Sequence, residues 1–282
     1  MGLLTVRDRQ LDLSVPVVMG ILNVTPDSFS DGGRYPTIEE ALKRIVEMER
    51  EGAAIIDIGG ESTRPGSDPV SAEEEYRRVI PVLKEAVASC PDLLFSVDTT
   101  KPEVAEAALN AGAHIINDVS AMRSGTVLPE LCKKYEAGYV LMHSQGEPRT
   151  MQEDPRYEDP VKEILHFFRQ KLKELNRCGV SRVILDPGIG FGKLSEHNLK
   201  LLAGLDQFSG LGFPLLIGAS RKSFIGGLLD GRPADERLAG TLAVHYDSLV
   251  RGASILRVHD VREAADTIRV FQAIRNVERK ES

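Results

Sequence analysis

The sequence predicts an α/β fold in which eight parallel strands alternate with helices and close into a barrel. Two observations predict it. Eight short apolar runs recur along the 282 residues, and segments with helical periodicity lie between them. Strands that alternate with helices indicate parallel β-α-β units. Eight such units close into a (β/α)8, or TIM, barrel.

Nearly every predicted strand ends at a polar or charged residue. In chain order the strands are expected at Val17–Leu22, Ala54–Ile58, Leu93–Val97, His114–Ile116, Tyr139–Met142, Val183–Leu185, Pro214–Ile217 and Ser254–Leu256. The carboxyl ends of the strands of such a barrel share one mouth, where the active sites of this fold lie. The polar residues that follow the strands are therefore the candidates for an enzyme site.

The helices between these strands have consistent start and stop signals. Capping boxes are predicted at Thr37-x-x-Glu40, Ser71-x-x-Glu74 and Thr100-x-x-Glu103, and Asp159-Pro160 fits an N-cap followed by a first-turn proline. Glycines that suit a helix end follow at Gly52, Gly112, Gly138, Gly179 and Gly252.

Three connections are long for a barrel, and all three follow strands, on the predicted catalytic face. They are Val24–Pro36 after the first strand, Gly59–Val70 after the second and Ser144–Asp159 after the fifth. Loops of this length are usually functional or mobile. We expect them to cover the substrate, because idle surface loops would not all fall on one face.

Composition limits the classes of protein to consider. No linker or change in composition divides the chain, so residues 1–282 are expected to form one domain. The formal charge of −7 argues against a nucleic-acid binder. No membrane span or signal peptide is predicted. Cys90, Cys132 and Cys178 follow no metal or redox spacing, which favours idle thiols in a reducing cytoplasm.

Asp98, Asn117 and Asp186 follow the third, fourth and sixth predicted strands. Carboxylates only accept hydrogen bonds, whereas an asparagine amide both donates and accepts. The trio could read the edge of a polar heterocycle that carries an amino group and ring N–H donors. Two carboxylates could instead share a metal or act as acid and base. Any one of the three could also be a strand-end cap.

A second group of residues points to an anion. Ser220-Arg221-Lys222-Ser223 follows the seventh strand and opens a short predicted helix, Ser223–Leu229. A helix start favours anions, Lys222 adds a mobile charge, and Ser223 can cap the helix or bind a carboxylate. Arg257 and His259 end the eighth strand and should point the same way. Loops after strands seven and eight often bind phosphate, so we interpret this pair as a phosphate or pyrophosphate site.

Other residues of the expected mouth have weaker signals. The Asn23 amide oxygen is a candidate Mg²⁺ ligand, because Mg²⁺ prefers oxygen and often completes its shell with substrate phosphates and water. Arg64 could meet an anion, while Thr63 and Pro65 could pack on a flat ring. Phe191 could stack on an aromatic ligand and Met142 could line the pocket, although core packing also explains both.

Taken together, these segments closely resemble the dihydropteroate synthases, the folate-pathway family targeted by sulfonamides. The matching segments are Met19–Gly32, Asp57–Gly66, Ser96–Thr99, Ile116–Ser120, Leu185–Lys193, Gly218–Phe224 and Arg257–Asp260. The resemblance runs from about Val17 to Val261, with no departure at a motif position.

The resemblance implies a reaction: 6-hydroxymethyl-7,8-dihydropterin diphosphate condenses with 4-aminobenzoate to give 7,8-dihydropteroate and pyrophosphate. It also implies three subsites. Asp98, Asn117, Asp186 and Lys222 would hold the pterin, with Met142 and Phe191 against its ring. Asn23, Arg257 and His259 would hold the diphosphate and Mg²⁺. Phe29, Thr63, Arg64, Pro65 and Ser223 would surround the aminobenzoate.

For the chemistry we expect a dissociative, SN1-like substitution in which Asp98, Asp186, Lys222, Arg257 and His259 stabilise the separating charges. A pterin-dependent methyltransferase is the nearest alternative, and a non-catalytic pterin-binding barrel is another. A methyltransferase would not need Asn23 with its loop or the predicted anion site. A non-catalytic barrel would have lost a strand-end polar group, and none is missing. Pyrophosphate release would distinguish both from a synthase. The family also implies a homodimer, for which the sequence shows no decisive interface.

Overall fold

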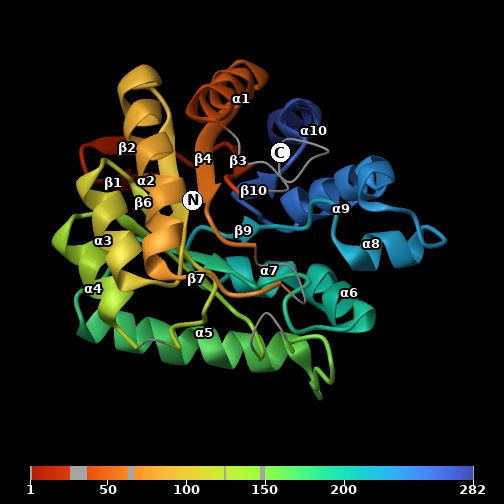
Figure 1. Cartoon of the computed structure of the whole chain (residues 1–282). Coiled ribbons are helices and arrows are strands. Elements are labelled where there is room, and N and C mark those ends of the chain that lie inside the picture. Colours follow the sequence, from red (N-terminus) through yellow and green to blue (C-terminus); the bar gives the residue numbers. More distant parts are fainter. Residues whose placement is uncertain (1, 26–36, 63–66, 124, 147–149, 282) are drawn as a thin grey trace.

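The predicted barrel is present in the computed structural model, which describes residues 2–25, 37–62, 67–123, 125–146 and 150–281. The side chains of residues 278–281 are outside the description. Within these ranges, eight parallel strands alternate with helices, and Figure 1 shows the helices arranged around the strands.

The barrel strands lie where the apolar runs predicted them, within one or two residues at each end. They are β3 (Val17–Asn23), β4 (Ala53–Gly59), β5 (Leu94–Asp98), β6 (Ile115–Asp118), β7 (Gly138–Met142), β8 (Val183–Asp186), β9 (Leu216–Ile217) and β10 (Ile255–Val258). Their order in the sheet is β8-β7-β6-β5-β4-β3-β10-β9. A parallel bridge between Leu185 and Leu215 joins the two ends, so the barrel is nearly closed.

The helices connect consecutive strands or follow them. They are α1 (Ile38–Glu51), α2 (Ala72–Ser89), α3 (Pro102–Asn110), α4 (Val127–Lys134), α5 (Pro160–Arg177), α6 (Ser195–Ala203), α7 (Leu205–Ser209), α8 (Ser223–Leu228), the 3-10 turn η1 (Ala234–Glu236), α9 (Leu238–Val250) and α10 (Val261–Glu281). None of the described helices is long and apolar enough to cross a membrane.

Most of the predicted helix signals are confirmed. Thr37 and Glu40 form a reciprocal capping box, Ser71 accepts from the Glu74 N–H, and Asp159 accepts from the Lys162 N–H. Gly52, Gly112, Gly179 and Gly252 all have positive φ angles near helix ends.

Two of those signals are wrong. Helix α3 begins at Pro102 with Lys101 as N-cap, so the Thr100 capping box does not form. Gly138 is the first residue of β7, and Glu136 takes the positive φ before it. A Cβ on Gly138 would lie 3.0 Å from Cγ1 of Val6, so close packing explains this glycine.

Val6 belongs to a two-stranded hairpin that the sequence analysis did not predict. Its strands are β1 (Leu3–Val6) and β2 (Arg9–Asp12). Leu4, Val6 and the following Leu13 are buried against the inside of the barrel strands. The hairpin therefore closes the end of the barrel opposite the carboxyl ends of its strands.

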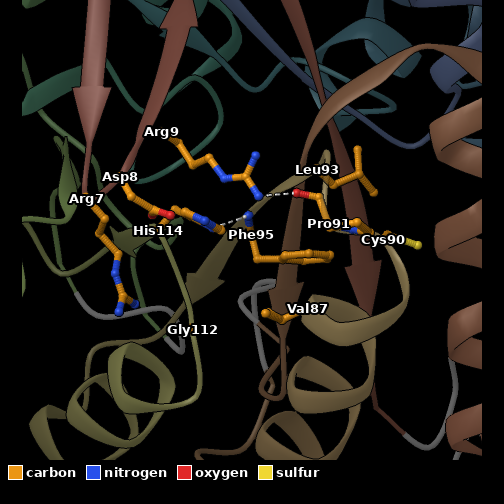
Figure 2. A pocket seen from close by; sticks show the side chains of 10 residues that line it. All are labelled: Arg7, Asp8, Arg9, Val87, Cys90, Pro91, Leu93, Phe95, Gly112 and His114. Atoms are coloured by element: carbon orange, nitrogen blue, oxygen red, sulfur yellow. Dashed lines mark hydrogen bonds between the residues drawn. The ribbon is translucent and has the colours of Figure 1, made fainter.

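Figure 2 shows the hollow of about 220 Å³ that this hairpin makes with the barrel wall. Arg9 Nη2 donates to the Pro91 carbonyl at 2.5 Å, and the His114 Nδ1 accepts from the Phe95 N–H at 3.1 Å. Arg7 Nη1 donates to two further carbonyls, those of Leu109 and Ala113. The two arginines hold the hairpin in place, and contacts at this end of a barrel serve stability rather than catalysis.

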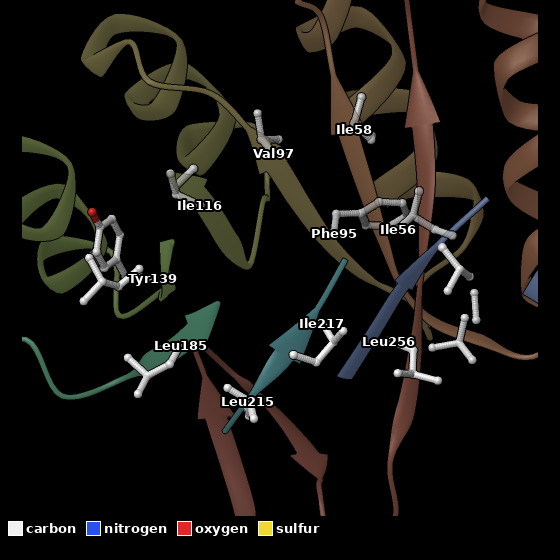
Figure 3. Close-up of a cluster of buried hydrophobic side chains, with 14 of the residues drawn as sticks. Ile56, Ile58, Phe95, Val97, Ile116, Tyr139, Leu185, Leu215, Ile217 and Leu256 are labelled. Atoms are coloured by element: carbon white, nitrogen blue, oxygen red, sulfur yellow. The ribbon is translucent and has the colours of Figure 1, made fainter. Parts of the chain in front are cut away.

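Inward-facing side chains form layers along the barrel axis. One layer takes an apolar residue from every strand: Met19, Ile55, Leu94, Ile115, Val140, Ile184, Leu216 and Ile255. The outward-facing residues, such as Ile56, Phe95 and Leu256, pack under the helices in a larger cluster, part of which is shown in Figure 3. Because strand side chains alternate, the residue two positions after each member of the inward layer also faces inward.

Candidate active site

The next inward layer changes from apolar to polar. It contains Ile21, Asp57, Ser96, Asn117, Met142, Asp186, Gly218 and Arg257, in strand order from β3 to β10. Asn23, Asp98, Ser220 and His259 lie one layer further toward the mouth by the same alternation. The predicted heterocycle trio and the predicted anion pair therefore converge inside one end of the barrel.

An ion-pair network joins both layers. Arg257 Nε donates to Asp57 Oδ2 at 2.6 Å, and its Nη2 donates to Asp98 Oδ2 at 2.9 Å. Burial alone would lower the pKa of Arg257, but the two carboxylates outweigh it and raise the pKa. Arg257 thus stays charged, and it carries further N–H groups toward which a ligand can turn.

Burial has the opposite effect on the carboxylates of this end of the barrel. It raises the pKa of Asp98, against the lowering effect of Arg257 and with a further rise from Asp57. It raises the pKa of Asp186 to about 6, although the Gly188 N–H, which donates to Asp186 Oδ1 at 2.7 Å, lowers it. Both carboxylates will gain stabilisation from any positive charge that develops beside them.

Lys222 and Phe191 form one wall of the site. Lys222 Nζ lies 4.0 Å from the centroid of the Phe191 ring, within the range of a cation–π contact. Burial lowers the pKa of Lys222 to about 8, with a further decrease from Arg257. Phe191 and Met142 are buried together with Val119 and Met151 in a small cluster separate from the main core. Lys222, Phe191 and Met142 therefore lie close together.

His259 is held by Ser220 on the neighbouring strand end. The Ser220 Oγ lies 3.0 Å from His259 Nδ1 and accepts from the His259 backbone N–H at 3.2 Å. Burial lowers the pKa of His259 to about 3, and Arg257 and Arg221 lower it further. The ring is therefore neutral near pH 7. If Ser220 donates to Nδ1, the Nε2–H remains as a donor for an anion.

The Ser220–Ser223 segment differs from the expectation in two details. Lys222 occupies the N-cap position of α8, and the exposed Ser223 is the first helical residue, so Ser223 does not cap the helix. The Arg221 side chain points away from the site and forms a bidentate ion pair with Asp260. The backbone N–H of Arg221 donates to Thr241 Oγ1. Arg221 therefore fixes the loop, while Lys222 reaches the site.

Two buried charged residues of the site were missed at the sequence level. Asp57 is fully buried, and Lys193 is 3% exposed. Lys193 Nζ donates to the carbonyls of Gly188 and Phe191, each at 2.9 Å, and lies 3.1 Å from His143 Nδ1. Two sequence features could have revealed these residues: Lys193 ends a glycine-rich turn, and Asp57 is a carboxylate inside an apolar run.

The described residues suit a metal only in combination with a substrate. Among them, no three His, Cys, Asp or Glu side chains lie together so that they could hold a metal ion. A Cβ on Gly59 would lie 3.6 Å from both Asn23 Oδ1 and Asp98 Cβ, so these two residues flank Gly59 at the mouth. One amide oxygen beside a carboxylate fits Mg²⁺ that also takes diphosphate oxygens and water.

The remaining predicted residues, Phe29, Thr63, Arg64 and Pro65, lie outside the described residues. The stem of the second long loop is described. Lys101 Nζ donates to Glu61 Oε2 at 2.6 Å and also to the buried Glu75, and Glu61 Oε1 accepts from the Val70 N–H at 2.9 Å. This ion-pair cluster ties both ends of that loop to α2 and to the start of α3.

The hairpin covers one end of this barrel, and the mouth at the other end holds carboxylates, an amide and cations. These features define a class of enzymes that bind a polar heterocycle together with an anion. Comparison with known proteins agrees. The family described as pterin binding enzyme matches residues 19–259. The dihydropteroate synthase of Escherichia coli (strain K12) is 48% identical over 269 residues, which cover 95% of this chain and 94% of that protein. That of Haemophilus influenzae is 46% identical over 96% of this chain and 98% of that protein.

Solved structures agree with these sequence relatives. A Yersinia pestis dihydropteroate synthase in complex with a sulfonamide drug superimposes with a TM-score of 0.92 at 43% identity, over 97% of this chain and 99% of that one. The Thermus thermophilus enzyme in complex with 4-aminobenzoate gives 0.86 at 43% identity, over 96% and 99%. The chain belongs to the pterin-binding enzymes and, within them, to the dihydropteroate synthase family of transferases.

Proposed function

We propose that this site condenses 6-hydroxymethyl-7,8-dihydropterin diphosphate with 4-aminobenzoate, giving 7,8-dihydropteroate and pyrophosphate. The observation that carries this proposal is the convergence of Asp98, Asn117 and Asp186 with Lys222 and Arg257 inside one barrel mouth. The family membership supports the same reaction.

The three subsites are assigned as the family resemblance implies. Asp98, Asn117, Asp186 and Lys222 bind the pterin ring, with Met142 and Phe191 against its faces. Arg257 and His259 bind the diphosphate. Ser223, with Phe29, Thr63, Arg64 and Pro65, surrounds the aminobenzoate, and the exposed Ser223 at the start of α8 is near enough to Lys222 to join the two subsites.

Bond cleavage comes first in the proposed mechanism. The bond between the exocyclic methylene carbon and the diphosphate oxygen breaks, and its electron pair leaves with the diphosphate. Arg257 and the His259 Nε2–H stabilise that negative charge. Positive charge spreads into the dihydropterin beside Asp98 and Asp186. Burial raises the pKa values of these carboxyl groups, so their ionised forms are stabilised when that positive charge develops.

Bond formation follows without a protein nucleophile. The neutral amine of aminobenzoate attacks the methylene carbon, and its nitrogen then releases a proton to the departing pyrophosphate or to water. Asn23 would hold Mg²⁺, which when bound would supply charge neutralisation of the leaving group. We further propose that the whole chain forms one domain, works in the cytoplasm and assembles as a homodimer, as the family resemblance implies.

The test is a reaction of purified protein with the dihydropterin diphosphate, 4-aminobenzoate and Mg²⁺, in which pyrophosphate and dihydropteroate are measured together. Equal amounts of both products are expected. Pyrophosphate alone would mean that water captures the cation, which contradicts the aminobenzoate assignments. If the folded protein forms neither product, the proposed reaction is contradicted. A methyltransferase or a binding protein would give this result, because neither releases pyrophosphate.

A further inference from the structure

Asp57 is a charged residue in the centre of an apolar strand. Its neighbours in β4 include Ile56 and Ile58, and its side chain is fully buried. A buried carboxylate is costly unless it is paired and hydrogen-bonded. The Oδ2 of Asp57 meets this need by accepting two hydrogen bonds, from Asn117 Nδ2 at 3.0 Å and from Arg257 Nε at 2.6 Å.

The first of these bonds fixes the orientation of the Asn117 amide. A carboxylate can only accept, so the amide must turn its NH2 group toward Asp57 and its oxygen the other way. Asn117 is 2% exposed, and its Oδ1 has no hydrogen-bond partner among the described residues. A buried acceptor without a partner is rare and marks a place for a donor group.

The second bond holds Arg257 between two carboxylates. With Nε on Asp57 and Nη2 on Asp98, the guanidinium plane is fixed across β4, β5 and β10. Removal of Asp57 would release the Nε end, since Asp98 is bound only through Nη2. One carboxylate thus orients one residue of the proposed pterin subsite and one of the diphosphate subsite.

We propose that Asp57 is a positioning residue that makes this site selective for a heterocycle with an N–H donor facing Asn117, and that it does so by orienting Asn117 and Arg257. The inference rests on the proposed function, because it assigns a role within the same pterin subsite. It adds a residue that acts through Asn117 and Arg257.

Three variants test the proposal. Asp57→Ala removes both hydrogen bonds, whereas Asp57→Asn keeps one oxygen that can accept both. Tyr139→Phe is the matched control, because it also removes a buried hydrogen bond to a strand carboxylate, that of the Tyr139 hydroxyl to Asp118 Oδ2 at 2.6 Å, but lies among the outward-facing side chains. Should Asp57→Ala not fold, Asp57→Val fills the space with a strand-forming residue and removes the same bonds.

The readouts are the Kd for 6-hydroxymethylpterin by calorimetry and the KM for each substrate, on variants shown to be folded by circular dichroism. Asp57→Ala should raise the pterin Kd and the pterin diphosphate KM about tenfold, as expected when a buried hydrogen bond is lost. The aminobenzoate KM should change less than about threefold. Asp57→Asn should recover most of the affinity, and Tyr139→Phe should behave like the wild type.

Two outcomes would overturn the proposal: a folded Asp57→Ala protein with the wild-type pterin Kd, or equal increases in both KM values. If the wild-type protein forms dihydropteroate, either outcome contradicts the role of Asp57 and leaves the proposed function intact. A wild-type protein that binds the pterin but forms no product contradicts the proposed function alone, since the pterin Kd still measures the role of Asp57.

Discussion

Lys222 and Phe191 face each other across the wall of the site, with the ammonium nitrogen 4.0 Å from the ring centroid. The two residues come from different elements: Lys222 precedes α8 and Phe191 lies in the turn after β8. A ring held beside a charged group in this way offers a flat ligand an aromatic face and a hydrogen-bond donor at the same time.

Phe191→Leu should therefore weaken pterin binding. The change removes the cation–π contact and the aromatic face, which together are worth about 1–2 kcal/mol, or about five- to thirtyfold in affinity. The KM for the dihydropterin diphosphate, measured by pyrophosphate release, should rise by that factor. Phe191→Tyr keeps the ring and serves as the control. An unchanged KM in Phe191→Leu would show that the ring does not contact the substrate.

Asp186→Asn should lower turnover by at least about 100-fold, because it removes a charge that stabilises the developing cation. It should also stabilise the folded protein. The folded pKa of about 6 exceeds the ordinary value of 3.8, so ionisation of Asp186 costs about 3 kcal/mol of stability. This cost is fully present above pH 6 and absent below about pH 4.

The stability part of that prediction has its own measurement. The melting temperature of Asp186→Asn should exceed that of the wild type at pH 8 by several degrees, and the difference should disappear near pH 4. A difference that is the same at both pH values would mean that the carboxylate charge is not the cause. Near-normal turnover would contradict the assigned catalytic role.

The dependence of kcat/KM on pH should be bell-shaped. Activity is expected to rise between about pH 6 and about pH 7 as Asp186 and Asp98 ionise, and to fall through about pH 8 as Lys222 loses its proton. Lys222→Arg is the informative variant, since an arginine stays protonated and the alkaline limb should move to higher pH. A limb that stays near pH 8 in this variant belongs to another group.

Lys193→Met should affect both the fold and the pterin subsite. The buried Lys193 ammonium group donates to the carbonyls of Gly188 and Phe191. Its loss removes a donor from each of them and loosens the turn that presents the Phe191 ring, although the Gly188 carbonyl keeps the Phe191 N–H at 3.1 Å. We expect a loss of about 2–4 kcal/mol in the free energy of unfolding. The pterin KM should rise about tenfold, whereas the exposed Lys200→Met control should change neither. A stable Lys193→Met protein with a normal pterin KM would contradict this role.

Arg7→Met should lower stability without any change in substrate binding. Arg7 Nη1 donates to two carbonyls at the end of the barrel opposite the site, at 2.8 and 2.9 Å. Loss of these charged hydrogen bonds should cost about 2–4 kcal/mol by urea unfolding, with both KM values within about twofold of the wild type. Arg156→Met is the control, because the Arg156 side chain forms an exposed ion pair with Asp154 and its loss should leave the urea midpoint unchanged. A large change in either KM would show that the hairpin influences the site.

The sequence predicted the barrel well because its signals are local. Strand ends follow from apolar runs that stop at polar residues, and most helix ends follow from caps and glycines. The hairpin of residues 3–12 was missed because its two strands are short and only one side of it is buried. Gly138 was misread for the same reason, since its contact is with Val6 in that hairpin.

The candidate site divides along the same line. Asp98, Asn117 and Asp186 were predicted from their positions at strand ends, which the alternation of side chains makes reliable. Asp57 and Lys193 depend on partners 60 and 50 residues away, Asn117 and His143, and no local pattern reveals that Asp57 orients an amide on another strand. Arg221 and Lys222 are neighbours in the sequence, but Arg221 binds Asp260 and Lys222 faces the site. This difference also depends on a distant residue, Asp260, and no local pattern predicts it.

The hairpin at the far end also bears on access to the site. Leu4, Val6 and Leu13 pack on the apolar layer inside the barrel, so a molecule seated on the polar layer has packed side chains on one side and the mouth on the other. Substrates and products are therefore expected to pass through the mouth. Two strands of four residues, with no part in the chemistry, thereby support the apolar layer on which the site is built.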